Sequence, residues 1–182
     1  MGFTLMSKLI LSHVAIGAYD VEESARFYID LFGDEHVERL PTPALASPDI
    51  DVVWLRLGPV QLHLGQRGKI DRDTKDHFGV GISDAGLFHD IYRKAKERGI
   101  LQPLPFGHHI YELPGGDVQM FLVDPAGNTF EVDYPYGSDL DTALIDDLQR
   151  MSERYVQPIH ATQVSTFFSP MGKSIRPPEE PG

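Results

Sequence analysis

The histidine and carboxylate side chains are the clearest candidates for chemistry in this sequence. The chain has 182 residues, with eight histidines and no cysteine. Without cysteine it cannot form disulfides, thiolate metal sites, iron–sulfur clusters or a thiol nucleophile. Any bound metal must therefore be held by nitrogen and oxygen atoms, a donor set that suits Fe(II), Mn, Ni, Co and Zn.

Two of the histidines occupy equivalent places in an internal repeat. Ser12–Asp20 and Asp76–Asp84 each contain a histidine, then alternating apolar and small residues, then an aspartate. The alternation predicts a strand, so His13 and His77 begin equivalent strands. One histidine at a strand start is more often structural than a ligand, whereas two at matching places favour a shared site.

A carboxylate and one of two polar residues share this arrangement. Side chains alternate between the faces of a strand, so Thr129–Asp133 places Glu131 opposite its apolar neighbours. The matching strand Val60–Leu64 places both Gln61 and His63 on the corresponding polar face. The hairpins before these strands differ in length, so either Gln61 or His63 can be the equivalent of Glu131. With twofold-related halves, we expect these side chains to converge with His13 and His77 in one groove.

Each half of the repeat has the pattern of a β-α-β-β-β module. Asp20 and Asp84 are each followed by an amphipathic helical segment, which ends near Gly33 in the first copy and Gly99 in the second. Three extended segments follow each helix. They are expected at Val37–Leu40, Val52–Leu57 and Val60–Gln66, and then at Leu101–Leu104 or His109–Leu113, Val118–Val123 and Thr129–Asp133.

The predicted fold class is therefore α+β, with two tandem modules around a groove. We expect one domain over residues 1–137, with modules at 8–66 and 75–136, because a single module is too small to be stable alone. Residues 138–182 lie outside the repeat and are expected to form a helix over Asp141–Gln157 and an irregular proline-rich tail.

Composition excludes several classes of function. The formal net charge is −11, which argues against binding to a nucleic acid backbone. The apolar stretch Leu9–Ala18 is too short to span a bilayer and is interrupted by polar residues. We therefore expect a cytoplasmic protein without nucleic acid or membrane partners.

The sequence resembles the vicinal oxygen chelate superfamily, which includes glyoxalases, bleomycin resistance proteins and extradiol dioxygenases. The most specific match is the turn Asp124–Asn128, which is followed three residues later by Glu131. The resemblance covers about residues 9–136. The matching stretches are Leu11–Ile16, Asp20–Gly33, Val60–Leu64, His77–Val80 and Asp124–Val132.

The resemblance implies a divalent metal held by His13, His77 and Glu131, and a small substrate that chelates it through two neighbouring oxygens. Fe(II) is favoured, with Mn, Ni, Co or Zn as alternatives. Gln61 is a candidate fourth ligand. His63, and His108 and His109 in a loop bounded by glycine and proline, are candidate catalytic acids or bases. Trp54 is expected in the core.

Three functions remain open at this stage. The first is an extradiol-type dioxygenase, which is favoured by the residues that continue beyond Glu131 and by the C-terminal extension. The second is a glyoxalase- or epimerase-like lyase or isomerase, and the third is a resistance protein that binds a drug or metabolite without turnover. The family resemblance also implies a homodimer.

Overall fold

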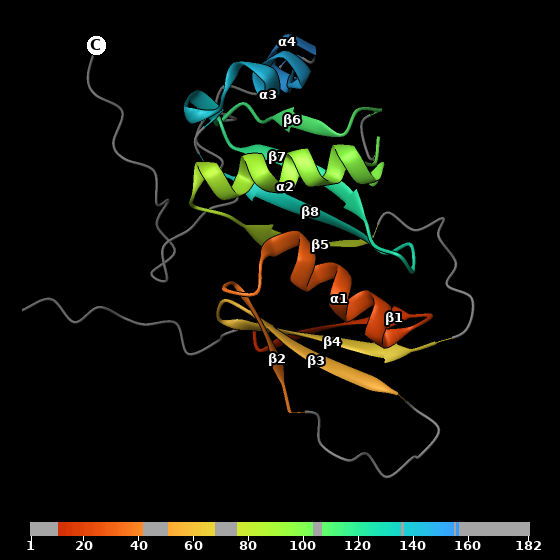
Figure 1. The fold of residues 1–182 in the computed structure, drawn as a ribbon. Coiled ribbons are helices and arrows are strands. Elements are labelled where there is room, and N and C mark those ends of the chain that lie inside the picture. Colours follow the sequence, from red (N-terminus) through yellow and green to blue (C-terminus); the bar gives the residue numbers. More distant parts are fainter. Residues whose placement is uncertain are drawn as a thin grey trace, which may run out of the picture.

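Two β-sheets, each with its own long helix, make up the computed structural model (Figure 1). The structure describes residues 11–41, 51–67, 76–103, 107–135, 137–154 and 156. The first sheet has the strand order β1-β4-β3-β2, and β1 and β4 run parallel. Its elements are β1 (His13–Ala18), α1 (Val21–Phe32), β2 (Val37–Leu40), β3 (Val52–Leu57) and β4 (Val60–Gln66).

The second sheet repeats this arrangement and adds one strand. Its order is β5-β8-β7-β6-β9, with β5 and β8 parallel. The two modules predicted from the internal repeat are therefore confirmed. The elements are β5 (His77–Gly81), α2 (Ala85–Arg98), β6 (Ile110–Glu112), β7 (Val118–Val123), β8 (Thr129–Tyr134) and β9 (Gln149–Arg150).

Local signals set the ends of both long helices. The Asp20 carboxylate accepts hydrogen bonds from the backbone of Glu22 and Glu23, and Asp84 accepts one from Leu87. These bonds satisfy amide groups that have no partner within the helix. Gly33 and Gly99 end the helices with positive φ angles of 95° and 65°, which glycine adopts without steric strain.

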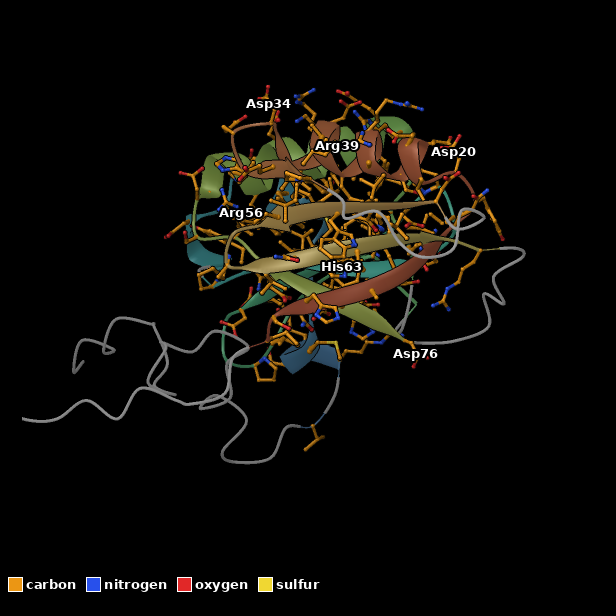
Figure 2. The ribbon with its side chains drawn as sticks, turned by 90° about the horizontal axis from the view of Figure 1, so that it is seen from below. Asp20, Asp34, Arg39, Arg56, His63 and Asp76 are labelled. Carbon is orange, nitrogen blue, oxygen red and sulfur yellow. The ribbon has the colours of Figure 1, made fainter. Side chains whose placement is uncertain are left out.

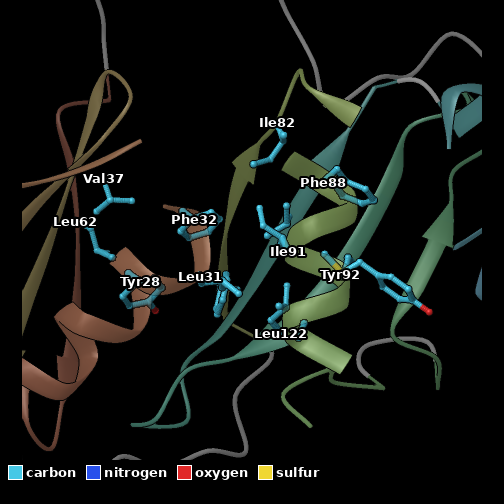
Figure 3. Close-up of a cluster of buried hydrophobic side chains, with 14 of the residues drawn as sticks. Tyr28, Leu31, Phe32, Val37, Leu62, Ile82, Phe88, Ile91, Tyr92 and Leu122 are labelled. Carbon is cyan, nitrogen blue, oxygen red and sulfur yellow. The ribbon is translucent and has the colours of Figure 1, made fainter. Parts of the chain in front are cut away.

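An aromatic cluster joins the two modules. Phe130 of β8 is fully buried, and its ring lies 5.5 Å from that of Tyr28 and 6.1 Å from that of Phe27, both on α1. Phe78 of β5 stacks on the same ring at 5.8 Å. Figure 3 shows the wider core, in which buried side chains of α1 and α2 face one another between the sheets.

The Asp124–Asn128 turn ties the second module to the first. The buried hydroxyl of Tyr28 donates to Asp124 Oδ2 at 3.1 Å, and the Asn128 amide donates to the carbonyl of Gly17 at 2.8 Å. Burial raises the pKa of Asp124 above its usual value. The most specific sequence motif of the chain therefore holds the module interface together as well as leading into β8.

The C-terminal segment forms two short helices and an added strand. Within the predicted helix Asp141–Gln157, helix is found at α3 (Thr142–Asp147) and at α4 (Met151–Arg154), but the prediction of one continuous helix is wrong because residues 148–150 interrupt it. Leu148 leaves the helix, and β9 then pairs with the edge strand β6, opposite Tyr111 and Glu112. Pairing with the open edge satisfies backbone groups that a longer helix would leave exposed. The segment also contains η1 (Gly137–Asp139).

None of the helices in the described ranges has the length and apolar character needed to cross a membrane.

Candidate metal centre

The register of the parallel strands decides which residues of the two modules are equivalent. In the first module His13 lies opposite Gln61, and Ala15 lies opposite His63. In the second module His77 lies opposite Thr129, and Gly79 lies opposite Glu131. In each module, the residue paired with the histidine lies two positions before His63 or Glu131. His63 is therefore the positional equivalent of Glu131, and Gln61 is the equivalent of Thr129.

The first module holds a histidine pair on its polar face. The rings of His13 and His63 stack with 4.6 Å between their centroids, and His63 Nε2 lies 2.9 Å from Gln61 Oε1. An amide oxygen only accepts, so Nε2 is the donor in this bond. Burial and the nearby His13 lower the pKa of His63 below its usual value. Figure 2 shows His63 on β4 among the strands of the first sheet.

Trp54 belongs to this polar face and not to the core. It pairs with His63 across β3 and β4, and the two rings stack at 4.2 Å. The core expectation for Trp54 is therefore wrong. The neighbours Val53 and Leu55 are buried, so strict alternation along β3 could have placed Trp54 beside His63.

The second module holds an imidazole and a carboxylate in contact. His77 Nε2 lies 3.4 Å from Glu131 Oε2, and Glu131 is only 13% exposed. The Gln119 amide donates to the same oxygen at 3.3 Å. The ring of Phe121 packs against His77 in an edge-to-face arrangement at 5.7 Å. These contacts hold the Glu131 carboxylate beside His77.

A second carboxyl group, that of Asp133, is buried beside Glu131. Burial raises the pKa of Asp133, and the nearby Glu131 carboxylate raises it further, to about 7. Asp133 Oδ1 is buried without a hydrogen-bond partner in the described part of the chain. A Cβ atom at Gly79 would lie 2.9 Å from Glu131 Oε1, so glycine leaves room for these carboxylates. The carboxyl groups of Glu131 and Asp133, one of whose oxygens lacks a hydrogen-bond partner among the described residues, lie next to the His77 imidazole, and these donors suit a divalent cation.

The raised pKa of Asp133 predicts a pH dependence of stability. The folded state holds the Asp133 proton more tightly than the unfolded chain does. Protonation of Asp133 therefore stabilises the folded state at low pH, and this stabilisation is lost as pH rises from about 4 to about 7. We expect Asp133→Asn to remove the part of this decline that Asp133 causes, and to stabilise the metal-free protein at pH 8 by on the order of 4 kcal/mol, while the raised pKa of Glu131 leaves a smaller decline. Urea unfolding with a chelator at pH 5 and pH 8 measures the effect. An unchanged pH dependence in the variant would contradict it.

No three donors of the two pairs, His13 with His63 and His77 with Glu131, lie within 4.8 Å of one another in the part of the chain that the structure describes. Among the described residues, only His108, His109 and Asp147 form a group of three or more histidine, aspartate or glutamate side chains with donor atoms all within 4.8 Å. The convergence of His13 and His77 in one metal centre stays a prediction. His108 and His109 lie apart from His77, which is separated from them by two packed rings, those of Tyr111 and Phe121.

The large cavity between the modules is a separate feature. It has a volume of about 730 Å³ and is lined mainly by apolar side chains such as Val14, Leu62 and Phe78. Gln61 borders it, whereas His13, His63, His77 and Glu131 do not. Both pairs therefore lie on sheet faces turned away from the helices, which pack on the apolar faces.

Comparisons with known proteins agree with this architecture. A family model described as the Glyoxalase/Bleomycin resistance protein/Dioxygenase superfamily matches residues 10–132, about two thirds of the chain. The Pseudomonas aeruginosa protein PA2024 is 27% identical over 143 residues, which cover 71% of this chain and 90% of that protein.

Solved structures share the fold. The oxidase ChaP-H2 superimposes with a TM-score of 0.56 at 25% identity, covering 72% of this chain and 98% of that one. A lactoylglutathione lyase from Agrobacterium tumefaciens superimposes with a TM-score of 0.50 at 22% identity, covering 70% of this chain and 94% of that one. The second likeness concerns the fold alone.

Proposed function

Because the chain belongs to the glyoxalase/bleomycin resistance protein/dioxygenase superfamily, we propose that it is a metal-dependent enzyme acting on a small substrate with two neighbouring oxygen atoms. His13, His77 and Glu131 are the proposed ligands. One observation carries the proposal: the equivalent registers put His13 with His63, and His77 with Glu131, at matching places on two sheets.

The proposed centre is completed by a second copy of the chain. His13 and His77 are both exposed at the starts of their strands, on faces that the helices do not cover. A twofold axis would bring the first module of one chain over the second module of its partner, and would do so twice. Each centre then takes His13 and His63 from one chain and His77 and Glu131 from the other.

The chain's own residues have distinct roles in this proposal. A divalent metal would supply positive charge for the substrate oxygens and, as Fe(II), the redox capacity to use dioxygen. Glu131 and Asp133 provide the negative charge that attracts the cation, and Gln119 orients Glu131 through its amide. Trp54 gives His63 a flat apolar support that also limits access of water.

His63 is the proposed acid–base group. Its Nε2 is occupied as a donor to Gln61, so the neutral ring presents Nδ1 as an acceptor. The pKa of His63 is lowered by burial and by His13, which keeps the ring neutral and able to take a proton near pH 7. Gln61 thus acts by fixing the tautomer of His63, and this assignment replaces its expected role as a ligand.

The favoured reaction is an oxidation by dioxygen, of the extradiol type. The likeness to the oxidase ChaP-H2 supports this choice. The C-terminal segment supports it as well, because Met151 of α4 packs on Tyr111 and Phe121, and Phe121 contacts His77. The C-terminal segment therefore supports Phe121, the ring that packs against His77.

A lyase or isomerase is the second candidate, and the register gives it specific support. With His63 as a fourth ligand beside His13, His77 and Glu131, the metal would supply positive charge for a substrate with two neighbouring oxygens. With three ligands, His63 would stay free as the acid–base group, and the metal would also supply the redox capacity to use dioxygen. The role of His63 therefore separates the two reactions.

Elemental analysis of anaerobically purified protein, followed by oxygen uptake on addition of catechol, tests the proposal. We expect iron, with oxygen consumed in step with catechol. We expect His77→Ala to lose both the iron and the uptake, and His63→Ala to keep the iron but lose the uptake. His36→Ala, a change at an exposed histidine outside both pairs, is the matched control.

Other outcomes have clear meanings. Nickel, zinc or cobalt without oxygen uptake, together with loss of the metal in His63→Ala, would replace the oxidation by the lyase or isomerase reaction. A stable protein that holds no divalent metal lost in His77→Ala would overturn the proposed enzyme and leave a binding protein.

A further inference from the structure

A second group of metal-type donors lies at the outer edge of the second sheet. His109 Nε2 is 2.9 Å from Asp147 Oδ2, and His108 Nε2 is 3.7 Å from Asp147 Oδ1. The two imidazole rings lie 4.4 Å apart. Figure 1 shows α3 and β6, which flank this group, at the end of the molecule opposite the first sheet.

The fold brings these three residues together from two distant segments. His108 and His109 directly precede β6, and Asp147 is the last residue of α3. The pairing of Tyr111 with Gln149 fixes the two segments side by side. His108 adds a bond from Nε2 to the backbone carbonyl of Asp147 at 2.5 Å.

Neighbouring groups hold the Asp147 carboxylate in place. The hydroxyl of Tyr92, on α2, donates to Asp147 Oδ2 at 2.5 Å. Burial raises the pKa of Asp147, but hydrogen bonds from Tyr92 and His109 outweigh this effect and bring the pKa below its usual value. The carboxylate is therefore ionised near neutral pH and oriented by a hydrogen bond from outside the group, as metal-binding carboxylates are.

The group is accessible from solvent. His108, His109 and Asp147 are 29%, 22% and 24% exposed, respectively. An open cavity of about 480 Å³ borders His108 and Asp147. The ammonium of Lys96 lies 3.8 Å from Asp147 Oδ2, on a side chain that is 62% exposed, and Arg150 and Arg154 also line the cavity.

We propose that His108, His109 and Asp147 form a second divalent metal site, which binds an ion of the zinc type. Two imidazoles and one carboxylate suit borderline ions such as Zn²⁺, whereas Mg²⁺ and Ca²⁺ prefer oxygen donors. In the metal-free protein His109 Nε2 donates a hydrogen bond to Asp147 Oδ2, and His108 Nε2 donates one to the Asp147 carbonyl. When these nitrogens bind the ion, the proton of each neutral ring moves to Nδ1. The site is independent of the proposed centre at His77 and does not require it.

An ion at this position would connect three parts of the second module. It would join the loop before β6 to α3, and through Tyr92 to α2. The segment that follows α3 carries Met151, which packs on Tyr111 and Phe121. The site therefore has a structural role: it fixes α4, whose Met151 supports the Phe121 ring beside His77.

Zinc binding to protein that lacks the first centre tests this inference directly. Isothermal titration with Zn²⁺ is done on the double variant His13→Ala/His77→Ala, for which we expect about one ion per chain. Adding His109→Gln, which keeps a polar group near Asp147, should abolish this binding. Tyr92→Phe should weaken it by about 10- to 100-fold, because it removes the bond that orients the carboxylate.

The controls separate this inference from the proposed function. His36→Ala removes an exposed histidine of the first module, which lies 3.6 Å from Glu35, and should leave zinc binding unchanged. Mg²⁺ should not compete. Circular dichroism verifies the fold of each variant, and the absorption of bound Co²⁺ reports the same ligands without relying on affinity. No zinc bound by His13→Ala/His77→Ala, or binding that persists with His109→Gln, would overturn the second site.

Discussion

Two inactive variants should restore activity when they are combined in one dimer. His13→Ala/His63→Ala removes the donors of the first module, and His77→Ala/Glu131→Gln removes those of the second. Each variant alone should lose the metal of the proposed centre and its oxygen uptake. In mixed dimers one centre takes both intact halves, so random pairing should recover about one quarter of the wild-type centres.

The mixing experiment separates a shared centre from one built within a single chain. The variants are co-expressed with different tags, and iron content and oxygen uptake are measured before and after isolation of the mixed dimer. The isolated mixed dimer should carry about half of the wild-type centres. No recovery in a mixed dimer that forms normally would exclude a centre shared between chains.

Phe130→Ala should cause a large loss of stability with little effect on the metal centre. The Phe130 ring is fully buried against Tyr28, Phe27 and Phe78, so its removal leaves a cavity at the module interface. The expected cost is about 3–5 kcal/mol in the free energy of unfolding, measured by urea denaturation. The side chain points away from Glu131, so the metal bound per folded chain should be unchanged.

A surface change is the control for this prediction. Val156 is fully exposed, and Val156→Ala should leave the urea midpoint unchanged. A Phe130→Ala protein as stable as the wild type would show that the aromatic cluster does not hold the modules together.

Local sequence patterns predicted the elements of both modules well. The alternation in Val60–Gln66 and Thr129–Asp133 gave the correct faces, because the side-chain period of a strand is a local property. The caps Asp20 and Asp84 and the terminal glycines marked the helices, because the bonds that they make span only a few residues. The helix predicted over Asp141–Gln157 is interrupted between α3 and α4, because residues 149–150 pair with the distant strand β6.

The register of the parallel pairs could not be predicted from spacing. Gln61 and His63 have the same parity, so alternation alone treats them alike. The pairing of β1 with β4 is fixed by packing between segments that lie far apart in the sequence, and it is this pairing that matches His63 with Glu131. The stacking of Trp54 on His63 became visible at the same level.

The sequence by itself determined the repeat, the family and the donor types, since eight histidines and no cysteine limit a metal to nitrogen and oxygen. Only the tertiary structure decided which donors meet. It kept the His13 pair and the His77 pair on separate sheets, and it joined His108 and His109 to Asp147. The physical reason is that ligand groups assemble through sheet register and helix packing, which depend on contacts between distant segments and not on local spacing.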